Sequence, residues 1–448
     1  MVRSVSGLPR AFWWLWTSTL VNRLGGFVAT FLAMYLTVER GHSATYAGLV
    51  AALYGLGGVA SSVGAGVLAD RLGRRPTLLA SQLGTAFSVA LLGFMEQPVA
   101  IAAAAFAVGA TSNASRPAVQ AMIADIVAPE DRMRAFSLNY WAINLGFAVS
   151  ASAAGLIAEH GYLLLFLGEA ALTLVCAVLV FVKLPESRPE TGTDGKAGTG
   201  AGAVAGRART SGEEGKSGKG AGGVSLGDVL RDGPFMAVVG LSFLVSVLFA
   251  QTYVALPLDM AAKGLSSSDY GLAIAANGVL IVVLQIPVTR LIERRDPARL
   301  LVASSLLVGG GMGLTAFAGS TVAYALVICV WTLGEIVNAP VQTGLVARLS
   351  PVHGRGRYQG VYTLSWSLAA LVAPLAAGSV IDRWGAGTLW AASAAVGAVA
   401  AAGYVLLVRA AARRDGEAAE TRAEGSGTAA AEGGSGAVAD GVGSAAGR

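Results

Sequence analysis

The chain has 448 residues, of which 54% are hydrophobic and only 13% charged, with a formal net charge of +5 at pH 7. A soluble domain of ordinary composition carries about 25% charged residues, so lipid must be the solvent for most of this surface. The positive charge therefore does not indicate binding of nucleic acid, because no folded soluble domain is present to carry such an interface.

Long apolar segments follow one another along the chain. A helix that spans a bilayer needs about 20 mostly apolar residues, and its backbone groups must be hydrogen-bonded within the segment. The expected transmembrane helices are 11–38, 46–69, 77–95, 98–124, 135–158, 162–184, 234–260, 268–291, 299–318, 321–347, 358–381 and 386–411. The predicted fold class is an all-α membrane protein with twelve spans. A barrel would instead show alternating strands of roughly ten residues.

Polar, low-complexity segments divide the chain into domains. Residues 185–233 are rich in Gly, Ala, Ser and Thr, which predicts a flexible cytoplasmic linker between two six-helix bundles, 11–184 and 234–411. Residues 1–10 form a short N-terminal segment, and the Ala-, Gly- and Glu-rich residues 412–448 are expected to be a disordered tail.

Basic residues set the expected orientation. With the N-terminus inside, the outer connections hold only Arg40, Lys263 and Arg383, while most other Lys and Arg residues lie in inner loops and tails. An excess of Lys and Arg on the cytoplasmic side is the rule for membrane proteins. Both termini are therefore predicted to be cytoplasmic, and the protein is expected to be a multi-pass protein of the plasma membrane.

The two halves also repeat each other in sequence. The segment Ala153–Glu159 is similar to Ala376–Asp382, and Asn113–Gln120 is similar to Asn338–Gln342, at offsets of 222 or 223 residues apart from small slips at the asparagine and the first proline. The fourth span thus corresponds to the tenth, and the fifth to the eleventh. Duplicated halves with a site at their interface, near the bilayer midplane, are characteristic of secondary transporters.

One charged connection lies between the second and third predicted spans and has the pattern G-x-L-x-D-R-x-G-R-R. Its pattern residues are Gly66, Asp70, Arg71, Gly73, Arg74 and Arg75. This pattern resembles the signature loop of the major facilitator superfamily. The resemblance implies two pseudo-symmetric bundles that work by alternating access, with Asp70 and Arg74 helping to lock the cytoplasmic side in the outward-open state. Asp70 would then face the N-terminus of the eleventh span, which favours an anion by about 0.3–1 kcal/mol.

The next inner connection contains Asp125, Arg132 and Arg134. These three residues are candidate partners of the signature loop in gating. The alternative interpretation is that they are ordinary surface charges.

Charged residues inside membrane spans are costly and usually functional. Arg23, Arg116, Glu169 and Glu335 lie within predicted spans. The resemblance implies that the first, fourth, seventh and tenth spans line a central cavity, which places Arg23, Arg116 and Glu335 there. The two arginines would steady an anionic substrate or intermediate. Glu169, in the sixth span, is expected to be structural or near the outer surface.

Glu335 lies near the middle of its span, in the segment Trp331–Pro340. This segment resembles the T-x-G-E-x-x-x-x-P stretch of some multidrug-efflux members of the superfamily. A carboxylate in a cavity can take up and release a proton, so Glu335 is predicted to couple proton or substrate movement. The alternative is a structural ion pair with an arginine.

Five uncharged polar residues are further candidates for lining the cavity. They are Asn22, Asn113, Gln251, Asn277 and Asn338. The alternative for each is a hydrogen bond that joins two helices.

The resemblance is imperfect in the fifth span. Drug/proton antiporters of this superfamily usually carry a signature there that ends in G-P-x-x-G-G. Here the corresponding segment, Gly146–Gly155, has Ser150 and Ala151 in place of the Gly-Pro pair. This departure weakens the assignment to that branch.

The predicted function is secondary active transport by alternating access, with proton-coupled efflux of a small amphipathic or hydrophobic compound. One alternative is uptake of a sugar or metabolite by proton symport. A remote alternative is a polytopic membrane enzyme, although the histidines His42, His160 and His353 stand alone. The expected partners are a small-molecule substrate, protons and the lipid bilayer. No cofactor, metal, nucleotide or nucleic acid is expected, and the protein is predicted to be a monomer.

Overall fold

The computed structural model describes residues 7–128, 131–184, 225–293, 295–351 and 355–433. Within these ranges it does not describe the side chains of residues 62–72, 116, 117, 121, 133, 355, 356, 408 and 410–433. Gly66, Asp70, Arg71 and Arg116 fall in this last group, so the predictions made for their side chains lie outside the described part of the structure.

The described residues form helices and no strand. The first lobe contains α2 (Arg10–Leu24), α3 (Val28–Met34), the π-helix η1 (Tyr35–Glu39), α4 (Ala44–Leu72), α5 (Arg74–Phe94), α6 (Pro98–Ile126), α7 (Arg132–Ala158) and α8 (Tyr162–Lys183). The second contains α9 (Leu226–Arg231), α10 (Gly233–Ala250), the 3₁₀ turn η3 (Gln251–Tyr253), α11 (Ala255–Ala262), α12 (Ser267–Ile292), α13 (Pro297–Leu314), the 3₁₀ turn η4 (Thr315–Phe317), α14 (Thr321–Leu349) and α15 (Arg355–Gly433). Eleven of the described helical stretches are long and apolar enough to cross a membrane.

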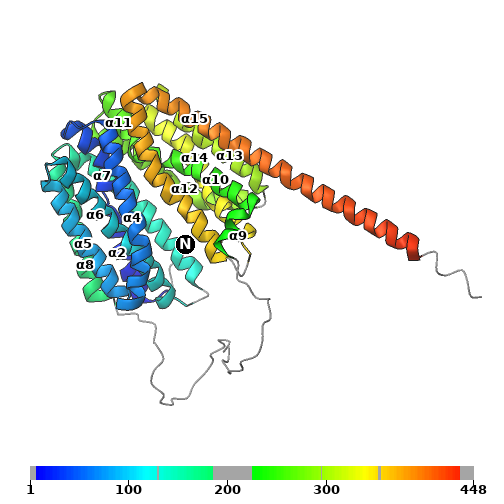
Figure 1. Cartoon of the computed structure of the whole chain (residues 1–448). Helices are drawn as coiled ribbons and strands as arrows, with labels where there is room; N and C mark the ends of the chain where they lie inside the picture. The colour runs from blue at the N-terminus through cyan, green and yellow to red at the C-terminus, as the bar shows by residue number, and fades with distance from the viewer. Residues whose placement is uncertain (1–6, 129–130, 185–224, 294, 352–354, 434–448) are drawn as a thin grey trace, which may run out of the picture.

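The last of these stretches, Arg357–Leu407, is 51 residues long. Gly385 interrupts it with a φ of 80° and a ψ of 163°, a conformation that favours glycine. Figure 1 shows α15 as two arms that meet at an angle. The break falls between the last two predicted spans, 358–381 and 386–411. Beyond them, α15 continues as helix to Gly433, whereas the sequence predicted a disordered tail. Its Ala, Glu and Arg residues have high helix propensity.

Two predicted spans are discontinuous in the structure. The first is divided into α2 and α3 at Gly25-Gly26, and the seventh is divided into α10 and α11 by η3. Glycine has the lowest helix propensity after proline, which accounts for the first break. The sequence predicted each of these spans as a single helix, and that prediction is wrong at both interruptions. The end of the predicted linker also folds, because Ser225 and Asp228 form a reciprocal capping box at the start of α9.

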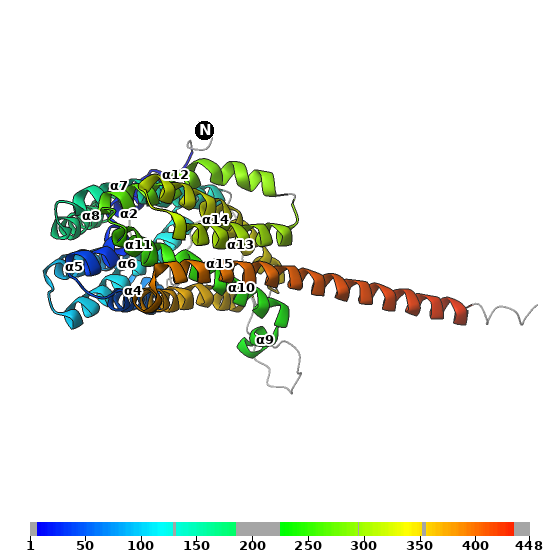
Figure 2. The same ribbon diagram turned by 90° about the horizontal axis from the view of Figure 1, so that it is seen from above.

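The two lobes meet along two helix pairs, α4 with α15 and α7 with α12. In Figure 1 the lobes adjoin at one end and their helices diverge toward the other, and Figure 2 shows the first lobe beside the second from above. We call the diverging end, which carries the α4–α5 and α6–α7 connections, the basic end. The other end, which carries the α5–α6 and α7–α8 connections, is called the opposite end.

Glycines allow close approach of the lobes toward the opposite end. A Cβ atom at Gly48 of α4 would collide with the carbonyl oxygen of Pro374, and one at Gly271 of α12 would collide with that of Ala151. Gly271 follows Gly48 by 223 residues, and Pro374 follows Ala151 by the same number. The repeat detected in the sequence is therefore a repeat of the contact between lobes.

The largest apolar core also joins the lobes. The ring of Phe31 in α3 packs edge-on against the ring of Tyr270 in α12, with centroids 5.2 Å apart. The Tyr270 hydroxyl donates to the carbonyl oxygen of Thr252 at 3.1 Å. That carbonyl lies in η3, where the regular helical hydrogen bonds are interrupted. Tyr270 therefore stabilises the break in the seventh span while it packs against the first.

Candidate functional site

Glu335 of α14 is hydrogen-bonded to α12. The Asn277 Nδ2 atom donates to Glu335 Oε2 at 2.8 Å and to Thr332 Oγ1 at 3.0 Å. Residues three apart on a helix share a face, so Thr332 and Glu335 present their oxygens together to Asn277. Thr332 donates in turn to the carbonyl oxygen of Ile328 at 2.7 Å. Asn277 and Thr332 are buried and Glu335 is half-buried.

The first lobe faces this cluster through α7. Tyr140 of α7 is 47% exposed and lies within electrostatic range of Glu335. Asn144 donates to the Tyr140 carbonyl oxygen at 2.9 Å. One turn further along α7, Ala148 lies directly against Gly278 of α12. Residues four apart on a helix lie on one face, so Tyr140 and Asn144 continue the face that meets α12. The cluster therefore adjoins the contact between the lobes.

The chemistry of the Glu335 cluster follows from its partners. In the described part of the chain, the hydrogen-bond donor to Glu335 is an uncharged amide. An arginine partner would hold a carboxylate in its ionised form, whereas an amide and a hydroxyl are compatible with either form. The arrangement can therefore hold Glu335 both as a neutral carboxyl group and as a carboxylate, with Tyr140 of the first lobe nearby.

Arg23 lies in the last turn of α2, away from α14. A Cβ atom at Gly146 of α7 would lie 2.5 Å from Arg23 Cβ, so α2 and α7 pack closely here. Arg23 also acts electrostatically on Glu169 of α8. Arg23 thus lies within electrostatic range of Glu169, which the sequence did not predict. Asn22 is half-buried in the same turn of α2.

Glu169 stabilises the interrupted first span. Its Oε2 atom accepts hydrogen bonds from the backbone N–H groups of Phe27 at 2.8 Å and Val28 at 2.7 Å. These are free N–H groups at the start of α3, where a carboxylate is favoured. The residue is 7% exposed, so it is a buried structural cap and does not lie at the outer surface. The signal in the sequence that could have suggested this role was the Gly25-Gly26 pair.

The remaining polar candidates are not brought to Glu335. Asn338 donates to Ser304 of α13 at 3.1 Å and is 1% exposed. Asn113 donates to the Gly109 carbonyl oxygen of its own helix at 3.0 Å. Gln251 is buried in η3. The placement of Asn338 and Asn113 favours helix packing over a role in a cavity. Of the predicted polar residues, Asn277 bonds to Glu335. Tyr140, which lies near Glu335, was not among the residues that the sequence predicted for the cavity.

The signature loop is fixed within the first lobe. Gly73 has a φ of 101°, which explains the glycine in this turn. Arg74 forms an ion pair of 3.0 Å with Asp125 at the end of α6. Asp125 is one of the three residues that the sequence predicted as partners of the loop. Arg75 donates to the Phe181 carbonyl oxygen, and its guanidinium lies 5.2 Å from the centre of the Phe181 ring. The loop therefore ties α5 to α6 and α8.

The other two basic candidates make contacts within their own connection. Arg132 donates to the Val127 carbonyl oxygen at 3.3 Å, and Arg134 pairs with Asp131 at 3.2 Å. These contacts order the α6–α7 connection next to the signature loop.

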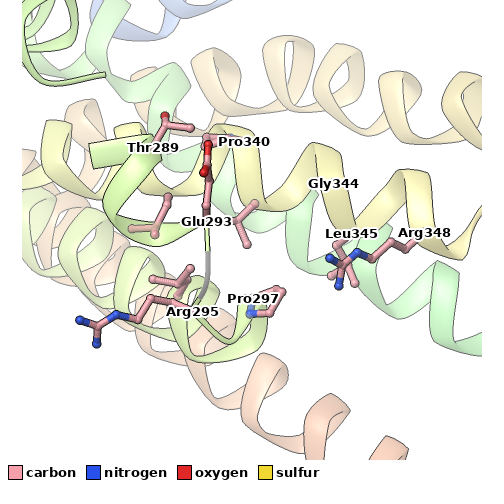
Figure 3. A pocket seen from close by; sticks show the side chains of 11 residues that line it. Thr289, Glu293, Arg295, Pro297, Pro340, Gly344, Leu345 and Arg348 are labelled. Carbon is pink, nitrogen blue, oxygen red and sulfur yellow. The ribbon is translucent and has the colours of Figure 1, made fainter. Parts of the chain in front are cut away.

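A separate cavity of 180 Å³ lies at the basic end of the second lobe. It is lined by α12, α13, α14 and the connection between α12 and α13 (Figure 3). In Figure 3, Glu293 points toward Pro340, and Arg295 points away from them. Because all of its walls belong to one lobe, this cavity is distinct from the cluster around Glu335.

Comparisons with known proteins place this geometry in context. The family model described as Major Facilitator Superfamily matches residues 15–258 and 238–433. A Na⁺, Li⁺, K⁺/H⁺ antiporter of Planococcus maritimus is 22% identical, over 80% of this chain and 89% of the relative. The multidrug resistance protein MdtH of Aeromonas salmonicida is 23% identical, over 88% of this chain and 94% of the relative.

Solved structures share the fold at low sequence identity. A D-xylose–proton symporter superposes with a TM-score of 0.69 at 14% identity, over 88% of this chain and 97% of the other. The nucleoside transporter NupG superposes with a TM-score of 0.71 at 12% identity, over 89% and 99% of the two chains.

Proposed function

Because this chain belongs to the Major Facilitator Superfamily, it is a membrane transporter and not an enzyme, and we propose that it exports a small amphipathic or hydrophobic compound in exchange for protons. The transport cycle is alternating access, in which the two lobes rock about a site between them. No nucleotide or cofactor is needed, because the proton gradient supplies the driving force.

The observation that carries this proposal is the position of Glu335. Its carboxylate is bonded to Asn277 within the second lobe, and it lies within electrostatic range of Tyr140 of the first lobe. A carboxyl group at this junction senses both lobes, so a change in its protonation changes their relative stability. Glu335 is therefore the proposed proton carrier, with Asn277 and Thr332 holding it in place.

The proposed topology has twelve spans, with α15 supplying the last two on either side of Gly385. The basic end faces the cytoplasm, so both termini lie inside, and the protein acts as a monomer in the plasma membrane. The charge distribution supports this orientation, because Arg74, Arg132 and Arg348 lie at the basic end. The lobes converge at the opposite end, which supports an inward-facing state for this structure.

An aromatic pair in the second lobe supports an apolar or amphipathic substrate. Phe249 of α10 and Trp366 of α15 stack with centroids 6.1 Å apart, at 9° between their planes. Trp366 is 37% exposed. Such aromatic surface offers contact area to an apolar or amphipathic compound. The relatives whose names include multidrug resistance and antiport point the same way.

Transport assays in proteoliposomes test the function. Candidate compounds are screened under an imposed pH gradient, and the internal pH is read with a dye. Efflux by exchange predicts that substrate movement is coupled to proton movement in the opposite direction. Substrate and protons that move in the same direction would establish symport instead.

The role of Glu335 is tested in the same vesicles. The Glu335→Gln variant should lose exchange driven by the pH gradient while inserting normally into the membrane. Glu96→Gln serves as the matched control, because Glu96 is exposed in the α5–α6 connection. Exchange at the unsubstituted rate in Glu335→Gln would remove Glu335 from the mechanism.

A further inference from the structure

Asp382 of α15 joins the two lobes at the opposite end. Its Oδ1 atom accepts a hydrogen bond from the backbone N–H of Ala44 at 3.1 Å, and its Oδ2 atom accepts one from Thr45 at 2.7 Å. Both donors lie at the start of α4, in the other lobe. The first N–H groups of a helix have no partner within the helix and carry its positive partial charge. Asp382 therefore supplies the acceptor and the negative charge that the start of α4 lacks.

Glu159 takes the corresponding position between the other two helices. It follows the last residue of α7, and its carboxylate lies near Ser266 and Ser268 at the start of α12. The Ser268 side chain first, and then that of Ser266, lowers the pKa of Glu159, although the nearby Asp269 acts in the opposite direction. The ionised form of Glu159 is therefore favoured beside the start of α12.

The two contacts are related by the internal repeat. Asp382 follows Glu159 by 223 residues, and Ser268 follows Thr45 by the same number. The glycines that allow the approach obey the same rule. A Cβ atom at Gly155 would lie 2.6 Å from the Ser267 carbonyl oxygen, and one at Gly378 would collide with that of Ala44. Each half of the chain therefore contributes one carboxylate and one helix start to this closure.

Both carboxylates are unfavourably placed within their own helices. Glu159 stands at the end of α7, and Asp382 stands near the end of the first arm of α15, before Gly385. A negative charge at a helix C-terminus is disfavoured by the partial charge of that helix. What offsets this cost is the contact with the other lobe. Each carboxylate is unfavourable at the end of its own helix and favourable in the contact with the other lobe. Its net contribution to stability therefore depends on the lobes meeting at this end.

We propose that Glu159 and Asp382 are a matched pair of gating residues that hold the transport pathway closed at the opposite end. Both contacts are made when the lobes meet there, and both must separate when the pathway opens at that end. Each contact stabilises the closed arrangement about 2- to 5-fold, and up to about 30-fold where partly buried. The pair acts additively, because its members lie in separate helix pairs. This inference rests on the proposed transport cycle.

The experiment measures the distance between the lobes directly. Nitroxide labels are placed at Gln97 and Gly319, which are exposed in the two lobes at this end, after replacement of Cys176 and Cys329. Distance distributions are recorded for the full chain in lipid nanodiscs without substrate. Glu159→Ala and Asp382→Ala should each increase the open-to-closed ratio about 2- to 5-fold. The double variant should multiply the two effects, and the exposed Glu96→Ala should have none.

Two further variants separate gating from a purely structural role. Glu159→Asp and Asp382→Glu keep the charge and should retain most of the closed population. A purely structural role would instead lower the melting temperature in the charge-conserving and the alanine variants alike. A double alanine variant with the distance distribution of the unsubstituted protein would overturn the proposal. The label distances are recorded without any measurement of proton exchange. A Glu335→Gln variant that exchanges at the unsubstituted rate would therefore contradict the proposed coupling, but it would leave the gating result unchanged.

Discussion

Asn277 on α12 and Glu335 on α14 are joined by a hydrogen bond of 2.8 Å, although 58 residues separate them in the chain. The same amide group also holds Thr332. One side chain thus positions both oxygens of the cluster, which makes Asn277 the most informative site for substitution around Glu335.

Replacement of Asn277 by alanine should slow proton-driven exchange. Hydrogen bonds between membrane helices contribute about 0.6 to 1.7 kcal/mol, which corresponds to a reduction of about 3- to 20-fold if the position of Glu335 limits the rate. Initial rates in proteoliposomes measure the effect. Asn113→Ala is the matched control, because its amide bonds within its own helix. Equal rates for the two variants would show that Asn277 does not position the proton carrier.

Substitution of Glu169 should destabilise the protein without involving the site. Glu169→Ala leaves the N–H groups of Phe27 and Val28 buried without their acceptor, at a cost of about 1–3 kcal/mol each. Glu169→Gln keeps a carbonyl acceptor and should lose less. Thermal unfolding in detergent measures both, with the exposed Glu39→Ala as the control. An unchanged melting temperature in Glu169→Ala would show that the α3 start finds another acceptor.

A large side chain at the glycine contact should force the lobes apart at the opposite end. Leucine at Gly271 collides with the backbone of Ala151, which cannot move aside easily. The Gln97–Gly319 label distance should therefore shift to longer values in Gly271→Leu. Gly240→Leu is the control, since a Cβ atom there meets nothing within 4 Å. An unshifted distance in Gly271→Leu would mean that the helices accommodate the side chain locally.

The Arg74–Asp125 pair should show a modest coupling energy. Its side chains are 14% and 32% exposed, and exposed pairs contribute about 0.2–1 kcal/mol. A double-mutant cycle on thermal stability, with Arg74→Ala, Asp125→Ala and both, should fall within this range. The cycle for Arg134 and Asp131, whose side chains are 28% and 38% exposed, should give a smaller value. A coupling of zero for Arg74 would leave the loop fixed by Gly73 and Arg75 alone.

The Glu159 contact should be insensitive to pH in the physiological range. Its pKa is lowered, mainly by the Ser268 side chain, so the ionised form is favoured and the contact is lost only as the pH falls below the ordinary value of about 4.3. The label distance should thus stay constant between about pH 6 and pH 8 in a Glu335→Gln background. A shift toward the open state near pH 6 would place a coupled proton at this end instead.

Local patterns in the sequence predicted the membrane-spanning helices well, because each segment must satisfy its own backbone in lipid. The 223-residue repeat similarly indicated which helices would be equivalent. Two features were missed for a local reason. The Gly25-Gly26 pair was not interpreted as a break, and the break at η3 has no glycine in Gln251–Tyr253 to reveal it.

The pairing of side chains could not be predicted to the same extent. Asn277, Asn113 and Asn338 are equivalent as polar residues inside spans, yet one bonds to Glu335, one to its own helix and one to Ser304. Which face of a helix meets which neighbour depends on how the helices are rotated and packed. Tyr140 was overlooked for the same reason, because the sequence does not show whether an aromatic residue in a span faces lipid, its own lobe or the other lobe.

The sequence by itself determined that this protein is an all-helical, internally duplicated membrane protein, because hydrophobic length and repetition are properties of the chain alone. Only the tertiary structure decided that Asp382 contacts the start of α4, 337 residues away at Thr45, and that Asn277 of α12 bonds to Glu335 of α14. Contacts between distant helices arise from packing geometry. A local sequence pattern does not show in which state of the transport cycle two distant helices are in contact.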